Sequence, residues 1–159
     1  MFEPVAAASW YCRASAVGSQ QFRVDAADAA GNEASAVRAY RVRYVVDGSF
    51  RPVDKGHIAD IVKAGRVIPL KWVLKDARGA LVRDPASFVS LVSMPVACGA
   101  SPKAAVAGGP EPIPANAVRF ARGIWHYNLT TPKEWSGSCR LIQLTLADGT
   151  RHYARFLFR

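Results

Sequence analysis

The sequence lacks the features that mark most membrane proteins and many enzymes. Its apolar runs fall short of the ~18 residues that a membrane-spanning helix needs. No His-x-x-x-His, Cys-x-x-Cys, Gly-x-Ser-x-Gly or glycine-rich phosphate-loop pattern occurs around the three histidines, three cysteines and twelve glycines. A Ser/His/Asp arrangement stays open, because its members can lie far apart in a sequence. We expect a protein that is not an enzyme and has no cofactor, metal or transmembrane segment.

Charge is unevenly distributed along the 159 residues, which carry a net charge of +9. Residues 1–47 hold five arginines and five acidic residues, whereas residues 48–159 hold sixteen basic and seven acidic residues. This asymmetry predicts two units with a boundary between positions 47 and 48.

The segment VKAGRVIPLKWVLKD (residues 62–76) has the period of a half-buried β-strand. One face carries Ile68, Leu70, Trp72 and Leu74, and the other face is polar. Proline has no N–H to donate to a neighbouring strand, so Pro69 predicts an edge strand or a bulge.

The rest of the second unit has the same period and no long segment of helical period. Further strands are expected at residues 88–94, 117–121, 124–130, 140–147 and 151–158. Asp148-Gly149 between the last two predicts a tight hairpin. Six or seven such strands predict an antiparallel β-sandwich of Ig-like architecture with Trp72, Trp125, Phe156 and Phe158 inside. Residues 99–116, rich in Ala, Pro and Gly, are expected to form a mobile surface excursion.

The first unit is expected to be a partial meander of three strands near residues 10–14, 21–25 and 40–46, with turns at 17–20 and 28–32. The stretch VGSQQFRVDAADAAGNEASA (residues 17–36) resembles the last strands of bacterial Ig-like repeats, which often end in a phrase of the type T-A-x-D-x-A-G-N. The resemblance implies that residues 1–47 are the C-terminal part of a truncated Ig-like domain.

The second unit resembles the PxKF domain, a family named for a Pro-x-Lys-Phe motif. The resemblance rests on VKAG (62–65), PLKW (69–72), WSGSCR (135–140), LADGT (146–150) and ARFLF (154–158). The motif residues are Lys63, Gly65, Pro69, Lys71, Trp72, Trp135, Gly137, Asp148 and Gly149. Trp72 replaces the phenylalanine of the motif. The resemblance implies a C-terminal module of a secreted or surface-attached bacterial protein, following Ig-like repeats, with no established activity.

Two of the three cysteines bear on the compartment. Cys98 ends one strand region and Cys139 begins another, 41 positions later. The family context and the absence of Cys-x-x-Cys favour a disulfide between them, and two reduced thiols in a cytosolic domain are the alternative. Cys12 is left without a partner, which a truncated first unit explains. The first residues lack the basic region of a signal peptide.

The sequence offers three binding hypotheses. Asp25, Asp28, Asn32 and Asp47 are calcium candidates, but such residues are also ordinary turn formers, and turns are the favoured interpretation. Trp135, Tyr153 and Arg155 are the candidate platform for a ligand, but packing in the core or in a hairpin is the favoured interpretation of the aromatic residues. The basic surface favours attraction to anionic wall polymers or membrane surfaces over nucleic acid, because the family context is extracellular.

The sequence thus predicts a non-enzymatic extracellular module that spaces, caps or anchors upstream domains of the same polypeptide. The alternative is a module that binds carbohydrate or cell-wall polymer.

Overall fold

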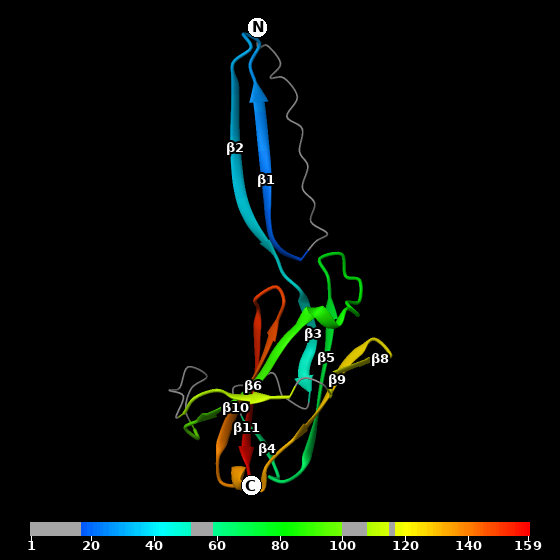
Figure 1. Ribbon diagram of the computed structural model, residues 1–159, viewed down its shortest axis with the longest axis vertical. Coiled ribbons are helices and arrows are strands. Elements are labelled where there is room, and N and C mark those ends of the chain that lie inside the picture. Colours follow the sequence, from blue (N-terminus) through cyan, green and yellow to red (C-terminus); the bar gives the residue numbers. More distant parts are fainter. Residues whose placement is uncertain (1–16, 52–58, 100–107, 115–116) are drawn as a thin grey trace.

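The computed structural model describes residues 17–51, 59–99, 108–114 and 117–159, and these form an all-β fold (Figure 1). No helix in these ranges is long and apolar enough to cross a membrane. Two 3-10 turns, Pro85–Ser87 and Lys133–Trp135, accompany the strands. The strands are β1 (Gly18–Ala27), β2 (Glu33–Val42), β3 (Val45–Arg51), β4 (Asp60–Val62), β5 (Val67–Lys75), β6 (Phe88–Val96), β7 (Glu111–Ile113), β8 (Arg119–Ala121), β9 (Ile124–Thr130), β10 (Cys139–Leu146) and β11 (Arg151–Phe158).

Two sheets form a sandwich, which confirms the predicted fold class. One sheet has five strands in the order β4-β11-β10-β6-β7, and the other has four in the order β3-β5-β9-β8. Neighbouring strands run antiparallel except β4 and β11, which are parallel. The short β4 was not predicted, because a run of three residues has no measurable period.

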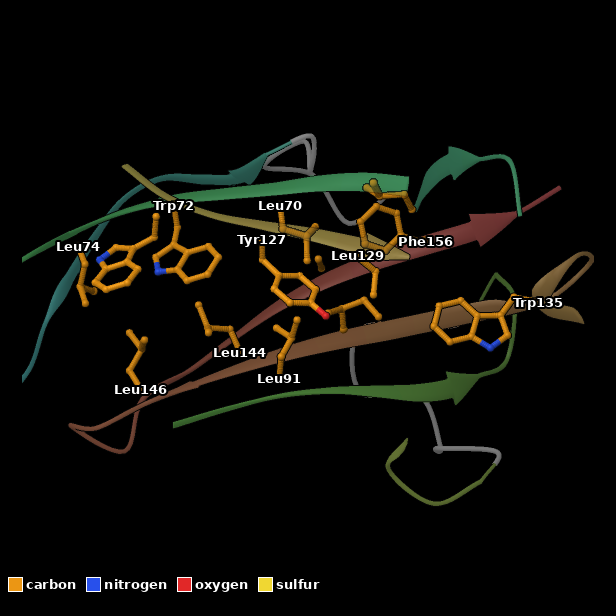
Figure 2. Packing of buried hydrophobic residues seen from close by; sticks show 14 of the residues in the cluster. Leu70, Trp72, Leu74, Leu91, Tyr127, Leu129, Trp135, Leu144, Leu146 and Phe156 are labelled. Carbon is orange, nitrogen blue, oxygen red and sulfur yellow. The ribbon is translucent and has the colours of Figure 1, made fainter. Parts of the chain in front are cut away.

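The core between the sheets follows from the period-two patterns of the strands (Figure 2). Along β5 the residues alternate between exposed and buried, and the four predicted core residues of this strand are at most 4% exposed. Trp125 pairs with Trp72 across β9 and β5, and the two rings stack with centroids 6.4 Å apart. Phe156 and Phe158 are fully buried on β11. The predicted core is confirmed.

The prediction of an edge position is wrong for β5 as a whole, because β3 and β9 flank it. The pairing of β3 with β5 runs only from Lys75 to Lys71, after a register shift between Asp47 and Arg51. On the other side Pro69 pairs with Asn128 of β9. Pro69 thus lies beyond the described pairing with β3, where a missing N–H donor is tolerated.

The C-terminal hairpin forms as predicted around Asp148-Gly149. The N–H of Gly149 donates to the carbonyl of Leu146 at 2.9 Å, and the N–H of Leu146 donates to the carbonyl of Thr150 at 3.0 Å. Gly149 has a φ of +80°, in the left-handed region that glycine adopts without strain.

The described part of the first unit is one long hairpin of β1 and β2, which extends from one end of the sandwich (Figure 1). The predicted turn at residues 17–20 is wrong, since β1 begins at Gly18. The predicted turn at 28–32 joins the two strands. The expected strand at 40–46 is divided, because β2 ends at Val42 and β3 begins at Val45 within the sandwich. The strand predicted near residues 10–14 lies outside the described residues.

The predicted excursion at residues 99–116 is wrong for residues 108–113, whereas residues 100–107 and 115–116 lie outside the described part of the chain. Glu111–Ile113 form β7, which pairs with β6 at the edge of the five-stranded sheet. Ile113 packs against the core, and a Cβ added at Gly108 would lie 2.9 Å from the Pro95 ring. Residues 108–113 are therefore part of the packed domain.

Candidate functional site

The aromatic residues of the PxKF-like motif lie inside the sandwich. Figure 2 shows Trp72 and Trp135 at opposite ends of the core. Trp135 is 7% exposed, and its ring meets the Phe158 ring edge-on with centroids 5.1 Å apart. The Trp72 ring is 2% exposed and stacks on Trp125, so this large aromatic side chain fills part of the core.

Other motif residues shape the backbone. Gly65 has a φ of +72°, and a Cβ placed there would lie 2.8 Å from Cγ of Lys133. A side chain at this position would thus be both strained and crowded. Gly137 adopts a φ of +77° between Trp135 and β10. Pro69 and Lys71 are exposed on the outward face of β5, and Lys63 is exposed after β4.

Asp148 joins the two hairpin regions of the molecule. Its side chain is 3% exposed, and Oδ2 accepts a hydrogen bond of 2.8 Å from the N–H of Tyr44, between β2 and β3. Oδ1 accepts from the N–H and the hydroxyl of Thr150 at 2.8 and 2.6 Å. Burial, together with the charges of Asp148 and Asp84, raises the pKa of the Tyr44 phenol. The carboxylate therefore holds the β2–β3 connection against the β10–β11 turn.

A pocket of about 480 Å³ opens beside this contact, lined by Arg41, Arg43 and residues 148–153; we call it the junction pocket. Arg41, Arg43 and Arg151 are exposed. None of their side chains makes an ion pair or hydrogen bond within the described part of the chain. Arg41 lies over the turn, since its Nη1 would be 3.3 Å from a Cβ at Gly149. The pocket is therefore rich in positive charge that the described residues leave uncompensated.

His152 lines the same pocket and is half-buried. Burial lowers the pKa of its imidazole, and the nearby charge of Asp148 opposes this shift. Its Nε2 atom is buried without a hydrogen-bond partner among the described residues. The ring is thus held in an environment that disfavours its charged form.

The predicted ligand platform is not assembled. Trp135 is in the core and packs near the end of β11, so it cannot present its face to a ligand. Tyr153 lies on β11 roughly 16 Å from Phe158, the residue that Trp135 contacts, and is 49% exposed. Arg155 is half-buried and lies between Tyr153 and Phe158 on β11. Of the three residues, Tyr153 alone lines a described pocket, which is the junction pocket.

The four calcium candidates are engaged in local hydrogen bonds or ion pairs, and only Asp28 and Asn32 contact one another. Asp28 accepts hydrogen bonds from the N–H of Ala30 and from Asn32 in the β1–β2 turn, and these bonds lower the pKa of its carboxyl group. Asp25 pairs with Arg23 at 2.6 Å, and Asp47 pairs with Lys75 of β5 at 2.6 Å. No group of three or more potential metal-binding side chains occurs in the described ranges. The turn interpretation of Asp28 and Asn32 is confirmed.

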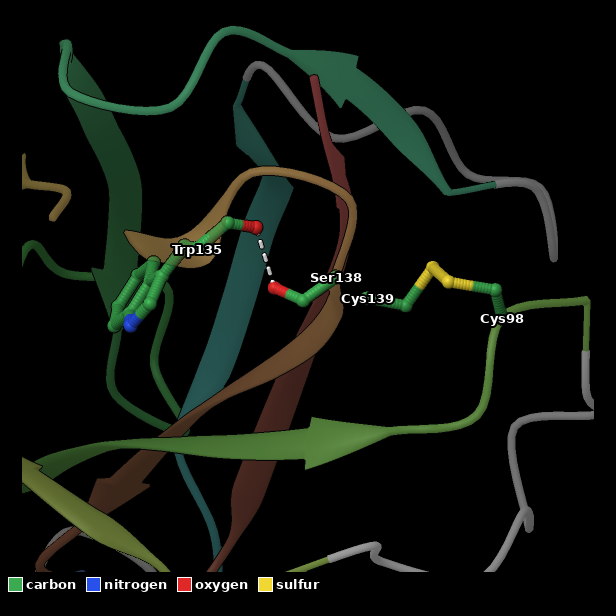
Figure 3. The surroundings of a disulfide bond; sticks show 4 residues. All are labelled: Cys98, Trp135, Ser138 and Cys139. Atoms are coloured by element: carbon green, nitrogen blue, oxygen red, sulfur yellow. Dashed lines mark hydrogen bonds between the residues drawn. A yellow bond between two sulfur atoms is a disulfide. The ribbon is translucent and has the colours of Figure 1, made fainter. Parts of the chain in front are cut away.

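The disulfide between Cys98 and Cys139 forms as predicted, with Cα atoms 5.2 Å apart (Figure 3). It joins the end of β6 to the start of β10, next to the turn in which the Ser138 hydroxyl donates to the Trp135 carbonyl. Cys139 begins β10 and pairs with Val96, the last residue of β6, and Cys98 follows two residues later. The bridge therefore reinforces an existing strand pair.

Arg140 forms a second cluster that the sequence did not reveal. Its guanidinium lies 4.1 Å from the centre of the Trp135 ring and donates to Glu111 Oε2 at 2.6 Å and to Ser93 Oγ at 3.2 Å. The contacts join β10 to β6 and β7. Neither this cluster nor the junction pocket has a local sequence signal, because each combines residues that are far apart in the chain.

Comparison with protein-family models gives no match for this chain, and comparison with curated proteins gives no relative. The resemblances to the PxKF and Ig-like families stay predictions carried by the quoted motifs.

Proposed function

We propose that the chain is a non-enzymatic, extracellular structural module of the PxKF type. It belongs at the C-terminal end of a larger secreted or surface-attached bacterial protein, where it spaces, caps or anchors the domains before it. In this proposal the strands before β3 end an Ig-like domain, and the sandwich that begins with β3 forms the cap.

The observation that carries the proposal is the junction between hairpin and sandwich. Only Arg43 and Tyr44 separate β2 from β3, and the N–H of Tyr44 is bound to the buried carboxylate of Asp148. A short, hydrogen-bonded connection supports a fixed orientation between the strands before it and the sandwich after it. This is the mechanical requirement of a spacer or cap.

The roles of the motif residues also support a structural function. Trp72 and Trp135 fill the core, Gly65 and Gly137 provide left-handed backbone, and Asp148 forms the junction. In an enzyme family, the motif residues are expected to point toward a shared reacting group. The motif residues of this chain instead stabilise the fold.

The disulfide supports an oxidising compartment. Structural disulfides persist in secreted proteins and are rare in the cytosol. Cys98 is exposed to solvent, so a reducing cytosol would have access to the bridge.

The test is fractionation of the source bacterium combined with differential alkylation of cysteines. We expect the protein in the culture medium or on the cell surface, with Cys98 and Cys139 protected from alkylation until a reductant is added. Recovery in the cytoplasm with both thiols alkylated at once would overturn the proposal.

A further inference from the structure

We propose that the junction pocket binds an acidic glycan, with Arg41, Arg43 and Arg151 on its anionic groups and the Tyr153 ring beside a sugar face. This binding role goes beyond the structural role above and does not depend on it. It also gives a carbohydrate or wall-polymer ligand a location away from Trp135.

The three arginines reach the pocket from two segments that are more than a hundred residues apart in the sequence. Arg41 belongs to β2 and Arg43 to the connection that follows, whereas Arg151 begins β11. The Tyr44–Asp148 hydrogen bond of 2.8 Å fixes these segments against one another. The positive charges are therefore held together before a ligand arrives, which lowers the entropic cost of binding.

The one carboxylate that lines the pocket does not neutralise these arginines. Asp148 is 3% exposed, and both of its oxygens accept hydrogen bonds from Tyr44 or Thr150. No ion pair joins it to an arginine in the described ranges. Three guanidinium groups therefore face one inward-turned carboxylate, and the excess charge favours an anion.

The chemistry of the lining suits an acidic sugar. A guanidinium group binds carboxylate or phosphate oxygens through two parallel hydrogen bonds. Tyr153, 49% exposed, adds an apolar ring and a hydroxyl to the same pocket. The volume of about 480 Å³ lies within the range of about 300–1,000 Å³ typical of small-ligand sites.

The same features disfavour nucleic acid. Proteins that bind single strands present a series of aromatic side chains along a basic track, one for each stacked base. Here Tyr153 is the one Phe, Tyr or Trp residue that lines the pocket, and the arginines come from the two segments that meet at the Tyr44–Asp148 contact. The arrangement fits one or two acidic sugar units better than a strand of bases.

The experiment measures binding by isothermal titration calorimetry at low salt with four hexameric probes. Hexagalacturonate supplies carboxylates, phosphorylated mannohexaose supplies phosphates, maltohexaose is neutral, and a DNA hexanucleotide carries phosphates without pyranose rings. Binding of either acidic glycan, with none of maltohexaose and at least tenfold weaker binding of DNA, is the expected result. The first two probes show which anionic group is preferred.

Matched variants locate the site. Each of Arg41→Gln, Arg43→Gln and Arg151→Gln is expected to weaken glycan binding about tenfold, which corresponds to one charged hydrogen-bonded contact. Arg66→Gln removes the same charge at the far end of β5, where only the backbone of Arg66 bonds to Thr131, and should leave the affinity unchanged. Tyr153→Phe should bind normally and Tyr153→Ala about fivefold more weakly, since the ring is the contacting group.

Several results would overturn the proposal. They are no binding of either acidic glycan at millimolar concentration, equal binding of DNA, or an effect of Arg66→Gln as large as that of Arg41→Gln. All substituted side chains are exposed, and thermal melting of each variant verifies that the fold is retained.

Discussion

At the scale of single residues, Asp148 combines a local and a long-range role. Its hydrogen bonds to Thr150 close the turn of the last hairpin, as the Asp-Gly pattern predicts. Its bond to Tyr44 spans 104 positions of sequence. The local role can be predicted because turn chemistry depends on two or three neighbouring residues. The long-range role cannot, because it depends on how the sheets pack.

Removing this carboxylate should therefore cost more than removing a carboxylate that serves a turn alone. We expect Asp148→Ala to lower the free energy of unfolding by about 3 kcal/mol, since the N–H of Tyr44 loses a charged acceptor in a partly buried place. The control is Asp76→Ala, which removes acceptors for Arg78 and Ala80 within one turn and should cost about 1 kcal/mol. Urea unfolding at neutral pH measures both, and equal losses would contradict the role of the junction contact.

His152 predicts a pH dependence of stability. Burial lowers the pKa of the folded imidazole, with Asp148 opposing, whereas the unfolded side chain titrates near about 6.5. As the pH falls below that value the unfolded state takes up the proton first, so the folded state loses stability until the pH passes the folded pKa. Above about 6.5 both states are neutral and the contribution is complete.

Replacing the ring tests this directly. His152→Phe should lose less stability than the wild type between pH 7.5 and pH 5, because the variant has no imidazole to protonate at this position. His126→Phe changes a half-buried histidine on β9 and should keep the wild-type dependence, because His152 is still present. Urea midpoints at both pH values supply the measurement. A wild-type slope in His152→Phe would contradict the burial argument.

At the scale of elements, the alternation of apolar and polar residues predicted most strands. It failed for features that depend on how strands pair. The bounds of β9 and β11 agree with the prediction because both strands have one buried and one exposed face along their whole length. The position of β5 inside its sheet could not be predicted, since Pro69 indicates a missing donor but not how far the neighbouring strand extends. β7 was missed because three residues flanked by prolines and glycines carry no period.

The segment around β7 is predicted to stabilise the domain. Replacing Glu111–Ile113 by Gly-Ser-Gly should lower the free energy of unfolding by about 2 kcal/mol, because it removes the ion pair to Arg140 and the packing of Ile113. Gly109→Ala, in the same segment with open space for a Cβ, should change stability by less than about 0.5 kcal/mol. Urea unfolding of both variants is the measurement. A loss below about 0.5 kcal/mol for the triple replacement would restore the expectation of a loose surface excursion.

At the scale of the whole molecule, hairpin and sandwich differ in how they are stabilised. The sandwich has a closed core, whereas most residues of β1 and β2 are exposed and two strands alone are marginally stable. The sequence predicted two units from charge, with a boundary at 47/48. β3 runs across that position and pairs with β5, and Val46 packs against the core of the sandwich. The charge distribution shows where the composition of the chain changes. Strand pairing determines where the hairpin ends and the sandwich begins.

The disulfide acts on the sandwich as a whole through its unfolded state. Closing a loop across 41 positions is worth about 4 kcal/mol of lost unfolded-state entropy in the chain-entropy model. The folded state should change little on reduction, because Cys139 already pairs with Val96 across β10 and β6. We therefore expect reduction to lower the free energy of unfolding by about 4 kcal/mol, with unchanged far-ultraviolet circular dichroism under native conditions.

The double variant Cys98→Ala/Cys139→Ala separates the effect of losing the disulfide from any other effect of the reducing agent. Its free energy of unfolding should fall by a similar amount, and slightly further because of the cavity left at the buried Cys139. The stability of this variant should no longer respond to dithiothreitol. The wild type with its bridge intact is the reference, and urea unfolding is measured for all states at one pH. A loss below about 1 kcal/mol on reduction would mean that the unfolded chain is already compact around β6 and β10. The sheet would then hold these strands together without help from the covalent link.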